Sequence, residues 1–192
     1  LVALAGPANR QGRIAADVIA GRTARFRGAQ GTSIIGLFDG AAAWSGASEK
    51  TLERLGDTDY EKIYLFPNSH AGYYPGTAMM NMKLLFAPDT GRILGGQVAG
   101  FDGVDKRLDV LATALRAELT VWDLEELELA YAPPFGSAKD PVNMAGFVAS
   151  NVLLGDLVLW YAQDYPHATD GARIIDVRTP EDAVRMLETT GC

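Results

Sequence analysis

Residues 131–143 restrict the fold of this chain more than any other stretch, because three of them are prolines and one is a glycine. Proline fixes φ and removes an N–H donor, so this stretch cannot form an ordinary helix or strand. It also carries a phenol, an amine, a carboxylate and an amide. We therefore expect a rigid loop, called here the proline-rich loop, that holds polar groups in place.

The remaining pattern predicts an α+β fold, in which an antiparallel sheet is packed with helices. Alternating apolar residues in 80–86 and a return in 92–99, joined by the turn 88–91, indicate a β-hairpin. Gly95 and Gly96 within it indicate a bulge or a close backbone approach. Further strands are expected at 32–38 and 62–66. Helices are expected at 7–21, 48–55, 103–118, 120–126 and 142–154.

Composition excludes several classes of function. The net charge of −7 argues against a nucleic-acid partner, and the apolar runs are too short to span a membrane. The chain has two histidines and one cysteine, Cys192, without any metal-ligand spacing, so no metal site and no internal disulfide are expected. Low cysteine content suits a cytoplasmic setting. The start at Leu1, without methionine or a basic flank, predicts a fragment of a longer protein.

Three stretches resemble the coenzyme A-disulfide reductases, which are FAD-dependent pyridine nucleotide-disulfide oxidoreductases. They are 5–13, 68–76 and the proline-rich loop, and the resemblance runs from about residue 2 to residue 155. It implies that 1–21 end an FAD-binding domain and that 22–155 form the dimerisation domain. A linker at 156–171 would then lead to a truncated rhodanese-like start at 172–192, whose first strand is expected within 172–181.

The resemblance also implies roles for particular residues. Tyr73 and Tyr131 would be catalytic, reaching across a dimer toward the redox cysteine and the CoA sulfur of the partner. A phenol with a pKa near 10 stays protonated at neutral pH, so it can donate a hydrogen bond to a developing thiolate. The structural alternative is that each tyrosine packs in the core with its hydroxyl satisfied.

Two weaker assignments accompany the tyrosines. Pro7 and Ala8, at a helix N-terminus, would contact the flavin through the backbone, or else begin a plain solvent-facing helix. Lys139 would meet a CoA phosphate, or else pair with Asp140. His70 lies in a matched stretch, where a loop hydrogen bond is the more ordinary role for it.

The implied function is the dimerisation part of a FAD- and NAD(P)H-dependent reductase of CoA disulfide or CoA persulfide. The redox cysteine and the NAD-binding domain are absent from this chain, so we expect the chain alone to be inactive and to bind neither cofactor. Its partner would be a second copy, forming a homodimer. Two alternatives stay open. One is an NADH oxidase or peroxidase, which the stretch 137–141 disfavours; the other is a free-standing dimerisation or binding module without redox activity.

Overall fold

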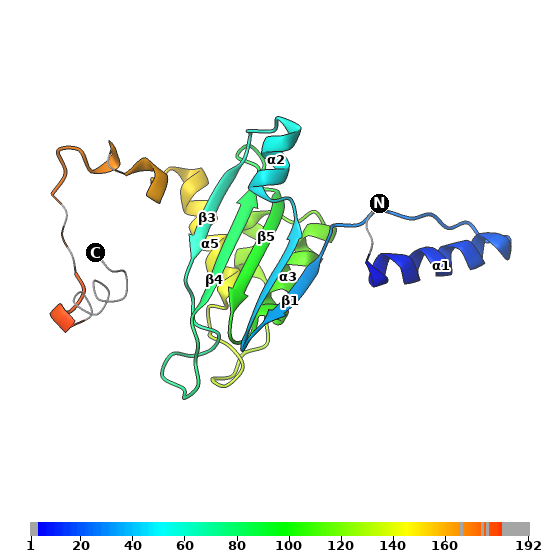
Figure 1. Ribbon diagram of the computed structural model, residues 1–192, viewed down its shortest axis with the longest axis horizontal. Helices are drawn as coiled ribbons and strands as arrows, with labels where there is room; N and C mark the ends of the chain where they lie inside the picture. Colours follow the sequence, from blue (N-terminus) through cyan, green and yellow to red (C-terminus); the bar gives the residue numbers. More distant parts are fainter. Residues whose placement is uncertain (1–3, 166, 174, 176, 182–192) are drawn as a thin grey trace. The chain divides into compact units, whose positions relative to one another are not determined.

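A five-stranded antiparallel sheet forms the centre of the chain, in the order β1-β2-β5-β4-β3 (Figure 1). The computed structural model describes residues 4–165, 167–173, 175 and 177–181. It divides the chain into two compact units, Leu1–Leu157 and Val158–Cys192. The strands are β1 (Ser33–Leu37), β2 (Gly40–Gly46), β3 (Glu61–Leu65), β4 (Met80–Phe86) and β5 (Ile93–Gly100).

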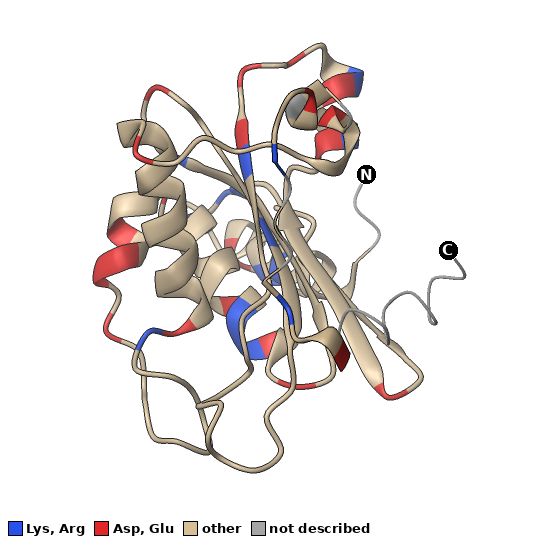
Figure 2. Ribbon diagram, turned by 90° about the vertical axis from the view of Figure 1, so that its left-hand side faces the viewer, with Lys and Arg blue, Asp and Glu red and all other residues tan. Residues whose placement is uncertain are grey.

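Helices cover one face of this sheet, and Figure 2 shows them beside the sheet in a view turned by 90°. Helix α3 (Val104–Arg116) packs on β2 and β5, α5 (Pro141–Leu154) packs on β3, and α4 (Val121–Glu126) packs on α5. Leu84 and Leu111 are fully buried in the layer between sheet and helices. Burial of one such side chain stabilises the fold by about 2 kcal/mol. The predicted α+β class with an antiparallel sheet is confirmed.

The predicted β4–β5 hairpin is confirmed, with Met82 opposite Val98. The pairing of the hairpin shifts in register between Leu85, opposite Gly95, and Phe86, opposite Ile93, and both glycines also mark close approaches. A methyl group at Gly95 would lie 2.0 Å from the Ala47 carbonyl oxygen, and one at Gly96 would lie 2.9 Å from the Leu111 side chain. Gly95 therefore lies against the backbone that follows β2, and Gly96 lets α3 approach the sheet more closely than a larger residue would allow.

Helix ends follow local sequence signals. Ser48 begins α2 (Glu49–Leu55) and its hydroxyl accepts a hydrogen bond from the Thr51 amide, while Gly56 ends the helix with φ 72°. At α4 the Thr120 hydroxyl accepts from the Asp123 amide, and the Asp123 carboxylate accepts in return from the Thr120 amide. This reciprocal capping box satisfies two amides that the helix itself leaves unpaired.

The structure adds one strand that was not predicted and moves the start of one helix. Strand β2 was not predicted, because its run of glycine and alanine carries no alternating pattern; it pairs with β1 and β5 through its backbone. Helix α1 (Ala5–Ile19) begins two residues before Pro7, the expected start, since Leu4 already acts as its N-cap.

The second unit contains the short 3-10 helices Ala162–Asp164 and His167–Thr169. The division before Val158 falls inside the expected linker 156–171. The described residues of 172–181 are not in a strand, and two residues in the middle of the expected strand, 174 and 176, lie outside the described residues. A strand needs a neighbour to pair with, and the described part of this unit supplies none. Cys192 and the rest of 182–192 lie outside the described residues. Within the described part, no helix combines the length and apolar character needed to cross a membrane.

Candidate functional site

Two loops meet at one end of the sheet. The β3–β4 loop, residues 66–79, follows β3, and the proline-rich loop precedes α5; both lie at the lower end in Figure 1. The Ala71 amide donates a hydrogen bond of 2.9 Å to the Gly136 carbonyl, which joins the two loops through their backbones. Segments far apart in the sequence therefore form one surface.

The β3–β4 loop is held at its base by its own polar groups. The Ser69 amide donates to the Ala78 carbonyl at 2.8 Å, and the Ala78 amide donates back to the Ser69 hydroxyl at 3.2 Å. Asn68 and Met79 form an isolated antiparallel bridge just outside this pair. These contacts close the base, so the excursion that carries Tyr73 starts and ends at one point.

Tyr73 and Tyr131 come together at the tip of the two loops. Their hydroxyl oxygens are 3.4 Å apart, at hydrogen-bond distance. Tyr73 is 78% exposed and Tyr131 is 49% exposed, so neither is a core residue. The hydrogen bond between the two hydroxyls raises the pKa of Tyr73 above its ordinary value of 10.0, and partial burial adds to this increase. Tyr73 is thus protonated at neutral pH, and the hydroxyl hydrogen that the pair does not use in its own bond can be donated to an incoming group.

A buried arginine lies beneath this tyrosine pair. Arg107 on α3 is 2% exposed and its Nη2 donates to the Ser69 carbonyl at 2.6 Å. The same nitrogen donates to Oδ2 of Asp140 at 3.0 Å, and Nε donates to Oδ1 at 3.4 Å. Asp140 is also the N-cap of α5, where its Oδ1 accepts from the Val142 amide. One guanidinium therefore reaches both loops.

The two lysines near the proline-rich loop behave differently. Lys139 is exposed, and its neighbour Asp140 forms its ion pairs with Arg107 and, at 4.0 Å, with Lys106. Lys106 also donates to the Phe135 carbonyl at 3.1 Å. Asp140 therefore pairs with Arg107 and Lys106 and not with Lys139. Lys139 remains available to solvent.

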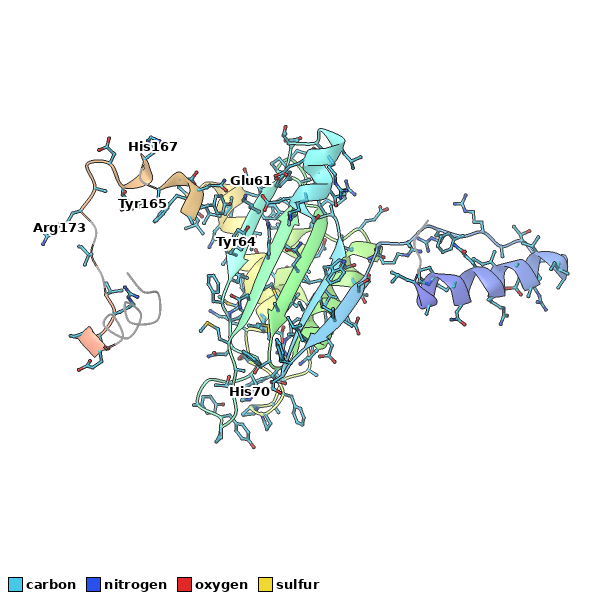
Figure 3. The ribbon with its side chains drawn as sticks, viewed as in Figure 1. Glu61, Tyr64, His70, Tyr165, His167 and Arg173 are labelled. Atoms are coloured by element: carbon cyan, nitrogen blue, oxygen red, sulfur yellow. The ribbon has the colours of Figure 1, made fainter. Side chains whose placement is uncertain are left out.

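His70 is enclosed by its own loop. It is 6% exposed, its Nδ1 lies 3.2 Å from the Ala71 carbonyl oxygen, and its ring meets that of Tyr74 edge-on at 5.8 Å (Figure 3). The Thr77 hydroxyl donates to the His70 carbonyl. These contacts give His70 a structural role in shaping the loop, as expected of a loop histidine.

The start of α1 offers different amides from those expected. Pro7 has no N–H, and the Ala8 amide donates to the Leu4 carbonyl at 3.1 Å as the first bond of the helix. The amides without an acceptor inside the helix are those of Ala5 and Gly6. A group bound by this helix start would therefore meet Ala5 and Gly6, with Pro7 setting the backbone angle.

Metal chemistry has no visible basis in the described residues, among which no group of three or more His, Cys, Asp or Glu side chains could hold an ion. In the same part of the chain, every buried polar side-chain atom has a hydrogen-bond partner. The groups that face outward at the loop tip are therefore phenols and not metal ligands.

Sequence reasoning missed Arg107, although a signal for it existed. Val104, Leu108 and Leu111 recur at the spacing of one helical face, and Arg107 falls on that same face. A charged residue on an apolar helix face is buried and must be paired. The sequence did not reveal the partners, because Ser69 and Asp140 lie in distant loops.

Residues 33–141 match the family model described as "Pyridine nucleotide-disulphide oxidoreductase, dimerisation domain". The match covers more than half of the chain, which therefore belongs to this family.

Two relatives show how far the sequence similarity extends. The coenzyme A disulfide reductase of Staphylococcus haemolyticus is 39% identical over 152 residues, which are 79% of this chain and 34% of that protein. The corresponding protein of Staphylococcus aureus, strain Newman, is 38% identical over 77% of this chain and 33% of its own length. This chain thus spans about a third of the length of the relatives it matches.

Solved structures are also similar to this chain in sequence and in fold. Reduced CoADR-RHD of Bacillus anthracis is 48% identical with a TM-score of 0.90, over 96% of this chain and 33% of that one. The NAD-dependent persulfide reductase from A. fulgidus is 38% identical with a TM-score of 0.74, over 77% and 27%. A water-forming NADH oxidase from Lactobacillus brevis is 25% identical with a TM-score of 0.75, over 80% and 34%.

Proposed function

We propose that this chain is the interface part of a FAD- and NAD(P)H-dependent reductase that acts on CoA disulfide or CoA persulfide. The observation that carries the proposal is the meeting of the Tyr73 and Tyr131 hydroxyls, 3.4 Å apart, on an exposed surface. The similarity to coenzyme A disulfide reductases and to a persulfide reductase supports this substrate class. Identity to the NADH oxidase is lower, which favours the CoA reductases.

The domain is proposed to act as a homodimer in the cytoplasm. Its tyrosine pair would enter the active site of the partner subunit, with residues 1–21 closing an FAD-binding domain and 22–155 forming the interface. The segments 156–171 and 172–192 would be a linker and the start of a rhodanese-like domain. The two phenols lie exposed on the surface, where a group of a partner subunit has access to them.

The tyrosines would stabilise sulfur as negative charge develops on it. When a disulfide is reduced, one sulfur leaves as a thiolate, and a phenol O–H can donate a hydrogen bond to that sulfur. The mutual hydrogen bond keeps Tyr73 protonated, since it raises the pKa of that phenol. Lys139, exposed beside this surface, is proposed to contact a phosphate of CoA.

A flavin is proposed to meet the described part of this chain at the start of α1. The amides of Ala5 and Gly6 fit an electron-rich ring edge, because they have no acceptor within the helix and the helix dipole favours negative charge there. When bound, FAD would supply the chemistry that carries reducing equivalents from NAD(P)H to sulfur. Since few flavin contacts lie within these residues, the chain alone is proposed to bind no cofactor and to turn over no substrate.

The test is NAD(P)H oxidation with CoA disulfide, measured on the protein expressed with the sequence that adjoins this chain in its gene. Tyr73→Phe and Tyr131→Phe are each expected to lower kcat by about 10-fold to 1000-fold, the range for loss of one stabilising donor. Tyr74→Phe, in the same loop, is the matched control and is expected to keep its activity.

Three results would contradict the proposal. The first is full activity of the Tyr73→Phe, Tyr131→Phe double variant. The second is turnover of CoA disulfide by the isolated chain. The third is a protein that lacks this activity altogether and forms dimers alone, which would identify a dimerisation module without redox activity.

A further inference from the structure

We propose that Arg107 is a positioning residue that sets the distance between Tyr73 and Tyr131 by tying both loops to α3 from inside the protein. Its catalytic meaning rests on the proposed function, while its geometric part stands on this structure alone. The Arg107 side chain forms its hydrogen bonds with Ser69 and Asp140 and not with the tyrosines, so the residue would act through the loops that carry them.

The first step is the geometry of the guanidinium. Nη2 is shared between the Ser69 carbonyl of the β3–β4 loop and Oδ2 of Asp140 at the end of the proline-rich loop, at 2.6 and 3.0 Å. Nε adds a contact of 3.4 Å to the other carboxylate oxygen. Arginine presents its donors in a fixed planar fork, so the two loops are held at a defined separation.

The second step is burial. Arg107 is 2% exposed and Asp140 is 3% exposed, so these bonds lie away from water while the loops are in place. A buried charge left without its partner is strongly unfavourable, which makes departure of either loop costly. The buried contact between Arg107 and Asp140 is thus harder to break than the exposed hydrogen bond between the two tyrosines.

The third step is the space reserved for this side chain. Gly103, just before α3, has φ +67°, and a methyl group there would lie 2.3 Å from Nη1 of Arg107. The backbone at the start of α3 therefore lies directly against the guanidinium. A side chain at position 103 would displace the guanidinium, so the position of Arg107 depends on the glycine at position 103.

The remaining loop contacts extend this arrangement to the tyrosines. The Ala71–Gly136 hydrogen bond joins the loops between Arg107 and the phenols, and Lys106 supports the Phe135 carbonyl from the adjacent position of α3. Arg107 at the base, the backbone bond above it and the Tyr73–Tyr131 contact at the tip form a ladder of three links. Removal of the base link is expected to let the tips separate.

The experiment measures the tip directly in this chain. Brief photo-oxidation at neutral pH couples neighbouring tyrosines to dityrosine, and mass spectrometry of the monomer band quantifies the Tyr73–Tyr131 cross-link. Arg107→Met and Arg107→Lys are expected to lose most of this cross-link. The lysine variant keeps the charge but lacks the fork, so it tests geometry and not charge. Should Arg107→Met not fold, as judged by circular dichroism, Arg107→Lys carries the comparison.

Leu111→Ala is the matched control, because it removes a fully buried side chain of the same helix that lies against Gly96 of β5. It is expected to lower stability and to keep the cross-link. An unchanged cross-link in the folded Arg107 variants would overturn the proposal, as would an equal loss in Leu111→Ala. The cross-link depends only on loop geometry, so this outcome is separate from that of the activity assay. If the activity is found, Arg107→Lys is also expected to lower kcat more than it changes KM.

Discussion

At the scale of single residues, one carboxylate binds several neighbouring side chains at once. Glu49, at the start of α2, accepts hydrogen bonds from Lys62 and Lys83 on the neighbouring strands. The Tyr60 hydroxyl donates to it at 3.2 Å, and that of Tyr64, seen on β3 in Figure 3, at 3.4 Å. This cluster fastens α2 to the sheet, because both lysines belong to strands.

Glu49 is therefore expected to make stability depend on acid pH. Burial by itself raises its pKa, but the hydrogen bonds from Lys62 and Lys83 outweigh burial and lower the pKa to about 2. A lowered pKa means that the contribution is complete above the ordinary value of 4.5 and is lost as the pH falls toward 2. Urea unfolding at a series of pH values should show a loss of about 2 kcal/mol for this group. Glu49→Gln should flatten that pH dependence; an unchanged slope would refute the assignment.

The tyrosine pair yields a second residue-scale prediction. In Tyr131→Phe the hydrogen bond to Tyr73 is lost, so the pKa of Tyr73 should fall back toward 10.0. Titration followed by the NMR shift of the labelled Tyr73 ring carbon measures this directly. Tyr60→Phe serves as the control, since Tyr60 bonds to Glu49 and should leave Tyr73 unaffected. A Tyr73 midpoint that does not move in Tyr131→Phe would mean that the phenols do not meet.

At the scale of elements, α4 and α5 are joined more closely than any other helices. The Asn143 side chain donates to the Leu124 and Leu127 carbonyls, both at 2.9 Å, and so satisfies the end of α4. Its oxygen accepts from the Asp140 amide and completes the capping box of α5. One amide side chain thus ends one helix and begins the next.

Gly146 sets how closely these helices pack. A methyl group there would lie 2.7 Å from the Glu125 amide nitrogen and 2.8 Å from the Val121 carbonyl oxygen, both backbone atoms. Gly146→Ala is therefore expected to destabilise the fold by about 1–3 kcal/mol, despite the better helix propensity of alanine. Thermal unfolding measures the loss. Gly12→Ala in α1, where a methyl meets nothing within 4 Å, is the matched control and should lose no stability.

Elements could be predicted from sequence where their signals are local. The caps at Ser48 and Thr120 and the alternation along β4 each involve adjacent residues, and those elements were found. Strand β2 was missed because glycine and alanine give it no alternation of apolar and polar residues. Its extended conformation follows from backbone pairing with β1 and β5. The site divides in the same way. Tyr73 and Tyr131 were singled out by their motifs, whereas Arg107 depends on partners that only the fold brings near.

At the scale of the whole molecule, the two units differ in what they bury. The described residues of Val158–Cys192 include none that is buried, whereas the first unit contains the sheet and its core. Since stability follows buried apolar area, the first unit should fold by itself. The chain 1–157 is expected to unfold at the same urea concentration as the full chain. A clearly lower midpoint for 1–157 would show that the second unit contributes to the core.

Asp140 belongs to the proline-rich loop, and its carboxylate accepts hydrogen bonds from Arg107 of α3 and from the Val142 amide in the first turn of α5. An opening of the proline-rich loop that withdraws this group also releases the Val142 amide to solvent. Loop opening and fraying of the helix would then be one fluctuation with a single free energy and a single rate of hydrogen exchange. Exchange at the Val142 amide would report how often the surface that carries Tyr131 comes apart.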